Sequence, residues 1–334
     1  MKTALIIGIF CLPFVGFSQQ QTLQKYDKVV TVLVQLGDTT PSHYQADFTQ
    51  EEVTRGKELI FTGRSRDPRG KKSKRISKFY TCTSCHNVVK ETDDLLSIDL
   101  DEKLNYAVKN QVPFLQGSTF KGMVNRESWY NDDYEKKYGD LVTKARSSLA
   151  ESVQLCAQEC SQGRKLKEWE LTAILAYFQS LSYTLDELNF NEEEWSVITQ
   201  GQDKQQKINL IKSKYLLKNA ATFGKLPTDK KTGYVGLLGD ANQGEKVYRY
   251  ACQSCHSEGG VSDVVLDNSK VTFKWLKKNI TANHSGSLYE IIRNGTYAES
   301  GHKEYMPNYT EEKMSNQQIE NLRAYIEKMD LMDK

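Results

Sequence analysis

The sequence contains the pattern Cys-x-x-Cys-His twice, and this pattern restricts what the chain can be because it holds a covalently attached c-type haem. The two thiols of each copy form thioethers with the porphyrin, and the adjacent histidine becomes an axial ligand of the iron. A zinc site would need further ligands at ribbon or finger spacing, and none follows. We therefore predict two covalently bound haem c groups. The residues are Cys82, Cys85 and His86 for haem 1, and Cys252, Cys255 and His256 for haem 2.

The N-terminal segment has the pattern of a secretory signal peptide. Lys2 precedes an apolar run over residues 4–15, and Gly-Phe-Ser at 16–18 is a plausible cleavage site. We expect removal of residues 1–18, a mature chain that begins at Gln19, and a periplasmic or otherwise exported protein. Lipidation at Cys11 is disfavoured because Phe10 stands where a lipobox has a small residue. No later apolar run is long enough to span a bilayer.

The charge of the chain is nearly balanced. Lysine and arginine number 45 against 43 acidic residues, which gives a net charge of +2. This balance argues against nucleic acid or a membrane surface as partner. One local excess stands out in residues 62–81, which contain eight basic residues and only Asp67 as an acid. Such a run is typical of a solvated loop, although it could also dock an acidic redox partner or steer an anionic substrate.

The chain repeats itself around the two motifs. A short amphipathic helical pattern with Gly56 or Gly244 precedes each motif, and a longer helical pattern with Tyr177 or Tyr325 closes each copy. Both copies resemble class I cytochromes c, in which an N-terminal and a C-terminal helix cross. We predict a mainly α fold with two tandem class I cytochrome c domains joined by an extended linker. The boundaries are a signal peptide at 1–18, a lead-in segment at 19–47, domain 1 at 48–185, a linker at 186–239 and domain 2 at 240–334.

The distal ligand of haem 2 is predicted to be Met306. It stands in a Tyr-Met-Pro turn between the Asn294-Gly295 helix end and the final helical pattern, which is the order in class I cytochromes c. A thioether suits haem iron and raises its potential. His284 and His302 are weaker rivals because no motif surrounds them.

When the two copies are compared position by position, the predicted distal ligand of haem 1 differs from that of haem 2. The position equivalent to Met306 is Gln158, which lies between Cys156 and Cys160. A thiolate ligand is therefore predicted, and two alternatives stay open. The two cysteines could form a disulfide if the helix breaks there, because i,i+4 side chains on a regular helix lie too far apart. Alternatively both thiols are buried and Met123 reaches the iron.

Around these cysteines the chain resembles the thiosulfate dehydrogenase family of dihaem cytochromes c. The resemblance rests on Leu149-Ala-Glu, a cysteine seven residues before Gly163, and the helical pattern from Glu170 to Tyr177. It implies that Cys156 is the haem ligand and Cys160 an addition. Ser152, Glu159 and Gln162 depart from the family pattern, which removes basic residues expected near an anionic substrate. The residues that could replace them as anion contacts are Lys121, Arg126 and Arg164.

These patterns predict electron transfer. A thiolate lowers the potential of an iron and a methionine raises it, so electrons should pass from haem 1 to haem 2 and then to a redox partner, such as a small cytochrome or a terminal oxidase module. The resemblance implies in addition that haem 1 oxidises or reduces a small sulfur oxyanion such as thiosulfate or tetrathionate. The alternative is a pure electron-transfer shuttle with no substrate. A haem peroxidase is disfavoured because both irons would have two protein ligands.

Overall fold

The computed structural model describes residues 23–282, 286–296 and 305–332, so the predicted signal peptide and the rival ligands His284 and His302 lie outside it. Within this part of the chain the regular structure is helical, and strand pairing is limited to three isolated bridges. The mainly α prediction is confirmed. No described helix is both long and apolar enough to cross a bilayer.

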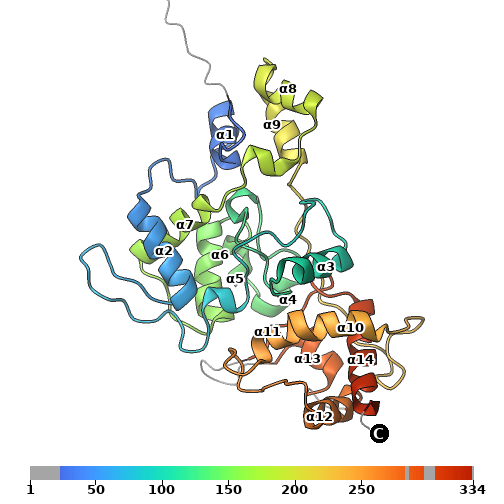
Figure 1. The fold of residues 1–334 in the computed structure, drawn as a ribbon. Helices are drawn as coiled ribbons and strands as arrows, with labels where there is room; N and C mark the ends of the chain where they lie inside the picture. Colours follow the sequence, from blue (N-terminus) through green and yellow to red (C-terminus); the bar gives the residue numbers. More distant parts are fainter. Residues whose placement is uncertain (1–22, 283–285, 297–304, 333–334) are drawn as a thin grey trace, which may run out of the picture.

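The helices form three groups that follow one another from one end of the molecule to the other (Figure 1). The first group is α1 (Val29–Leu36), η4 (Leu185–Leu188), α8 (Glu192–Gln200) and α9 (Lys204–Ser213). The middle group is α2 (Gln50–Thr62), η1 (Cys82–Ser84), η2 (Met123–Asn125), α4 (Tyr134–Tyr138), α5 (Leu141–Ala145), α6 (Leu149–Leu155), η3 (Cys156–Cys160) and α7 (Glu168–Ser180). The last group is α3 (Leu100–Asn110), α10 (Ala241–Val247), η5 (Tyr248–Cys252), α11 (Gln253–His256), α12 (Lys270–Ile280), α13 (Leu288–Asn294) and α14 (Asn316–Leu331).

The middle group is closed by the crossing of α2 and α7. A capping box starts α2, since the Thr49 side chain accepts from Glu52 N and the Glu52 carboxylate accepts from Thr49 N. At the crossing, a Cβ on Gly56 would lie 2.0 Å from the carbonyl oxygen of Ala173 and 2.8 Å from Cβ of Tyr177. The absence of a side chain at Gly56 is what lets the two helices approach and bury their apolar faces.

The last group repeats this crossing with α10 and α14. A Cβ on Gly244 would lie 1.9 Å from the carbonyl oxygen of Asn321 and 2.8 Å from Cβ of Tyr325. The helices that precede the distal positions also correspond. Ser148 caps α6 and Ser287 caps α13, each by accepting a hydrogen bond of 3.3 Å from the backbone N–H three residues later. The internal repeat read from the sequence is thus a repeat of helix packing.

The sequence analysis predicted an extended linker over residues 186–239, but part of this range is helical. Helices α8 and α9 lie in this range and pack against α1 of the lead-in segment, which gives a third apolar core around Val32, Ile198 and Ile211. Helix α9 ends at Ser213, and residues 221–239 contain no helix. The lead-in segment and the linker therefore support each other.

Helix α3 packs on the other haem-motif unit from the one to which its sequence position assigns it. It lies within the range assigned to domain 1, yet Leu104 and Ala107 belong to the apolar core of the last group. Its first turn also accepts hydrogen bonds from Gln318 of α14, through the Leu100 carbonyl and the Asp101 carboxylate, both at 2.9 Å. The two haem-motif units are consequently joined by shared packing as well as by the chain.

Residues 134–160 form a series of short helices. Gly139 ends α4 in a left-handed conformation with φ of 54°, and the last turn before Gly163 is π-helical, with Ser161 N donating to the Cys156 carbonyl at 2.8 Å. A π turn widens the spacing of its side chains and is often found at functional sites. Here it carries both Cys156 and Cys160.

Candidate haem sites

Cys82, Cys85 and His86 line a cavity of about 240 Å³ in the middle group of helices. The 3-10 turn η1 begins at Cys82, and its geometry brings Cys85 and His86 back over the turn, with both backbone N–H groups donating to the Cys82 carbonyl at 3.3 and 3.1 Å. All three predicted haem-binding side chains therefore face one space.

His86 is oriented for binding a metal through Nε2. Its Nδ1 lies 2.6 Å from the carbonyl oxygen of Ser118, and a carbonyl can only accept, so Nδ1 carries the proton and the Nε2 lone pair is free. The ring stacks on Phe120 with centroids 4.6 Å apart. Burial lowers the pKa of His86 to about 4, which keeps the imidazole neutral. A Cβ on Gly117 would lie 2.6 Å from Nδ1, so glycine is needed for this approach.

The thiols of Cys156 and Cys160 line the same cavity, and the described cysteines form no disulfide. The two thiols share a hydrogen bond, which raises the pKa of Cys156 and lowers that of Cys160 to about 6. Two tyrosine hydroxyls also lower the pKa of Cys160, because Tyr130 Oη and Tyr138 Oη lie 3.4 and 3.2 Å from its Sγ. Among the described residues, the Cys160 sulfur therefore has more hydrogen-bond partners than the Cys156 sulfur.

Met123, the remaining candidate for this position, also lines the cavity. Trp129 Nε1 donates to its Sδ at 3.2 Å, and His43 packs edge-on against the same indole with centroids 5.6 Å apart. This contact fixes the orientation of the thioether but leaves its second lone pair available. Besides the two thiols of the haem motif, the structure thus presents the sulfur atoms of Met123, Cys156 and Cys160 to this cavity.

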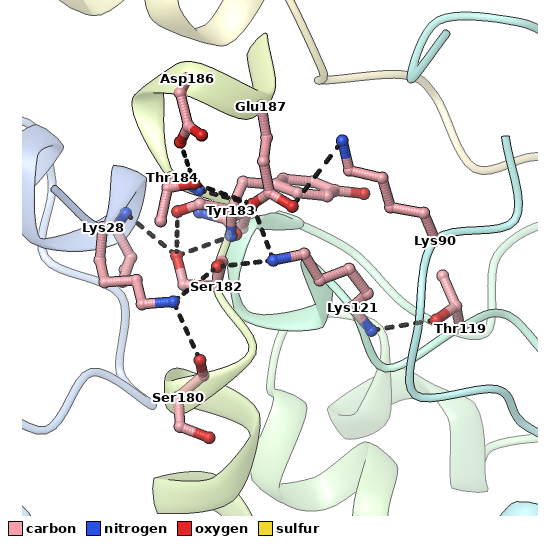
Figure 2. Close-up of polar contacts among 12 residues, drawn as sticks. Lys28, Lys90, Thr119, Lys121, Ser180, Ser182, Tyr183, Thr184, Asp186 and Glu187 are labelled. Atoms are coloured by element: carbon pink, nitrogen blue, oxygen red, sulfur yellow. Dashed lines mark hydrogen bonds and ion pairs between the residues drawn. The ribbon is translucent and has the colours of Figure 1, made fainter. Parts of the chain in front are cut away.

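The three predicted anion contacts are found in different places. Arg126 lines the cavity, and its guanidinium has no hydrogen bond or ion pair within the described part of the chain. Arg164 does not line it, because its guanidinium is bound to Glu170 at 2.6 Å and to nearby backbone carbonyls. Lys121 also lies elsewhere, with Nζ 2.7 Å from the Glu187 carboxylate and 3.3 Å from the Ser182 carbonyl (Figure 2). Of the three predicted contacts, Arg126 alone lines the described cavity.

The first cavity fits a haem c by its donor set. It offers two thiols three positions apart, an imidazole with a free Nε2, sulfur ligands for a second axial position, and apolar walls that include Ile174 and Phe178. The guanidinium of Arg126 is the charged donor that a propionate requires. Burial lowers the pKa of Arg126, and the charges of Tyr183 and Glu91 oppose this shift only in part.

The second motif has a matching local geometry. Cys252 ends the π-helical turn η5, and α11 carries Cys255 and His256. His256 Nδ1 lies 2.8 Å from the carbonyl oxygen of Val264, so its Nε2 is free as well. A Cβ on Gly260 would lie 2.4 Å from the Cys255 carbonyl oxygen, as one on Gly117 would from that of Cys85. The sequence analysis missed both proximal acceptors because they are backbone atoms and have no side-chain signature.

Met306 packs against the same apolar core as Cys252. Its backbone is held by Thr296, whose N–H donates to the Met306 carbonyl at 2.9 Å and whose Oγ1 accepts from Met306 N at 2.6 Å. Gly295 makes this pairing possible: it has φ of 68°, and a Cβ there would lie 2.4 Å from the Met306 carbonyl oxygen. The backbone of Met306 is therefore fixed beside the second motif.

The two motifs lie directly against each other. Cys255 Sγ is 3.7 Å from the carbonyl oxygen of Ser84. Close by, the Tyr80 hydroxyl donates to the Tyr305 carbonyl at 2.7 Å and accepts from Tyr305 N at 2.6 Å. Tyr305 also lines the first cavity, although it directly precedes Met306. The segment that carries the predicted ligand of one haem thus closes the cavity of the other.

The comparisons with known proteins agree with the second motif. Residues 239–326 match the family described as cytochrome C oxidase, cbb3-type, subunit III. No curated protein and no solved structure matches the chain. The matched segment covers α10–α13 and most of α14, including Cys252, Cys255, His256 and Met306. Residues 239–326 are therefore a c-type cytochrome domain, with covalently bound haem c as its cofactor and electron transfer as its chemistry.

Proposed function

We propose that the protein is an exported dihaem c-type cytochrome that passes electrons between two covalently bound haems. The observation that carries this proposal is the contact between the two motifs, where Cys255 Sγ lies 3.7 Å from the Ser84 carbonyl oxygen. Cys82 and Cys85 would attach one haem, and Cys252 and Cys255 the other. Each haem supplies a reversible one-electron centre when bound. Attachment sites in contact favour direct exchange because electron transfer slows steeply with distance.

The axial ligands give this exchange a direction. His86 with Cys156 would hold the first iron, and His256 with Met306 the second. Thiolate ligation lowers the reduction potential and methionine ligation raises it. Electrons should therefore enter at the first site and leave from the second to a small cytochrome or a terminal oxidase module.

The test is a count of covalent haem in protein produced with a cytochrome c maturation system. The intact mass should exceed that of the chain from Gln19 by two haems. The double variant Cys82→Ala/Cys85→Ala should retain one haem, and so should Cys252→Ala/Cys255→Ala. A single haem in the unaltered protein would overturn the proposal.

Oxidoreduction of a small sulfur compound is a second candidate function. It is supported by two thiols and the Arg126 guanidinium, which line the same cavity. Joining two thiosulfate ions to tetrathionate through a new S–S bond releases two electrons, which is one for each haem. Thiosulfate oxidation with ferricyanide as acceptor, and tetrathionate reduction in the reverse direction, test this function. Neither reaction should occur in a pure shuttle.

A further inference from the structure

Lys137 is a cation at the wall of the first cavity with no carboxylate partner among the described residues. Its Nζ makes one hydrogen bond, to Asn308 Oδ1 at 3.0 Å, and otherwise lies 5.4 and 5.6 Å from the ring centroids of Tyr305 and Tyr138. Its neighbour Lys136 is different, because it is exposed and forms an ion pair with Asp133 at 2.7 Å. An ammonium group has three donors, so Lys137 retains donors for another ligand.

Asn308 has an unsatisfied donor next to this cation. The residue is 8% exposed and lines the cavity, and its Nδ2 has no acceptor among the described residues. Exchanging the amide oxygen and nitrogen would not remove the problem, because Nδ2 would then face the ammonium of Lys137 and two donors would oppose each other. A buried amide donor without a partner is costly. The missing group is therefore an acceptor.

The two donors lie on the side of the cavity that carries the thiols. Tyr138, the residue after Lys137, has its hydroxyl 3.2 Å from Cys160 Sγ. Arg126 belongs to a different part of the wall, since it follows the η2 turn that begins beside Phe120, the ring stacked on His86. A haem propionate and a substrate anion thus have separate cationic groups available.

We propose that Lys137 and Asn308 form a binding subsite for a small sulfur oxyanion on the thiol wall of the first cavity. The identity of the anion, though not the donor geometry, rests on the second proposed function. One anionic oxygen would accept from Lys137 Nζ and another from Asn308 Nδ2. The sulfur end of the anion would then face Cys156 and Cys160.

The test is titration of the fully reduced dihaem protein with sodium thiosulfate, followed by calorimetry, so that no oxidation of the ligand accompanies binding. Lys137→Gln should weaken binding by about ten-fold or more, because a charge-assisted hydrogen bond is lost. Asn308→Asp should weaken it further, since the new carboxylate pairs with Lys137 and repels the anion. Lys136→Gln is the matched control and should bind as the unaltered protein does. Circular dichroism establishes that each variant is folded.

Two results would overturn the subsite. One is the absence of thiosulfate binding by the unaltered protein. The other is unchanged affinity in folded Lys137→Gln, and a shift of the first haem's midpoint potential in that variant would then assign Lys137 to a propionate. Binding that Lys137→Gln weakens, without thiosulfate oxidation, would support the subsite and reject the sulfur chemistry. Thiosulfate oxidation with unchanged affinity and KM in Lys137→Gln would support the sulfur chemistry and reject the subsite.

Discussion

Among single residues, the sulfur ligand of the proposed first haem would decide the chemistry of that site. We expect a low-spin His/thiolate electron paramagnetic resonance signal from the ferric protein that is lost in Cys156→Ala. The reason is that Cys160 Sγ already has the Tyr130 and Tyr138 hydroxyls as partners, whereas within the described part of the chain Cys156 is hydrogen-bonded only to the neighbouring thiol. A thiolate is the form that binds the metal.

The controls for this prediction are the two competing sulfurs. Cys160→Ala should keep the signal with a modest change in its g values, because it removes a hydrogen-bond partner and not the ligand. Met123→Leu should keep it unchanged. Loss of the signal in Cys160→Ala alone would assign the ligand to Cys160. If both cysteine variants keep the signal unchanged, thiolate ligation is wrong.

His43 makes stability depend on pH. Its Nε2 donates to the Val124 carbonyl at 2.9 Å, and burial lowers its pKa below the ordinary value of 6.5. The unfolded chain therefore takes up a proton before the folded protein does, so the free energy of unfolding falls as the pH drops below 6.5 and levels off once the folded pKa is passed. Above 6.5 both states are neutral and this contribution does not vary. Urea unfolding of His43→Gln should show a shallower pH dependence between about pH 7.5 and 5 than the unaltered protein, and equal slopes would exclude His43 as the cause.

At the scale of helices, Gly56 and Gly244 should contribute equally to the stability of the two motif units. Gly56→Ala and Gly244→Ala each place a methyl group within 2.0 Å of a backbone carbonyl oxygen of the facing helix. Because the contact is with backbone, the helices must separate, and we expect a loss of about 1–3 kcal/mol in the free energy of unfolding. Chemical unfolding followed by circular dichroism measures it. Lys57→Ala, an exposed change beside Gly56, is the control, and an effect no larger than that of the control would show that the crossing tolerates a side chain.

The sequence predicted the two helix crossings because they depend on local periodicity and are present twice. It could not predict the third core, since α1 and α9 are far apart in the chain and meet only in the folded protein. Lys121 and Arg164 were chosen for nearness in sequence, and each has a carboxylate partner that periodicity does not reveal. Lys137 lies on the short helix α4, and periodicity does not reveal its position at the cavity either.

At the scale of the molecule, the basic residues of 62–81 lie on one exposed segment, of which Gly63, Ile76 and Tyr80 line the first cavity. All eight are exposed, and none forms an ion pair with a described carboxylate. The Arg66–Lys72 bridge and the Asp67 carboxylate, which accepts from Arg69 N and Lys71 N, give this segment a fixed turn. Oxidation of the reduced protein by ferricyanide, a trianion, should slow by roughly ten-fold in Lys71→Glu/Lys72→Glu and with rising salt. A cationic cobalt oxidant should show no such slowing, and equal effects on both oxidants would exclude steering.

The contact between the two motif units should control electron exchange across the whole molecule. The Tyr80 hydroxyl makes two hydrogen bonds to the Tyr305 backbone, so it ties the first unit to the segment that carries Met306. Tyr80→Phe removes both, and each is worth about 0.5–1.5 kcal/mol. Flash photoreduction followed at a wavelength that separates the two haems should show slower internal electron transfer in this variant, with little change in either midpoint potential. Tyr26→Phe, at a position that is 79% exposed, should match the unaltered protein. An unchanged rate in Tyr80→Phe would mean that the other contacts between the units, including Cys255–Ser84, hold the two sites together without the tyrosine hydroxyl.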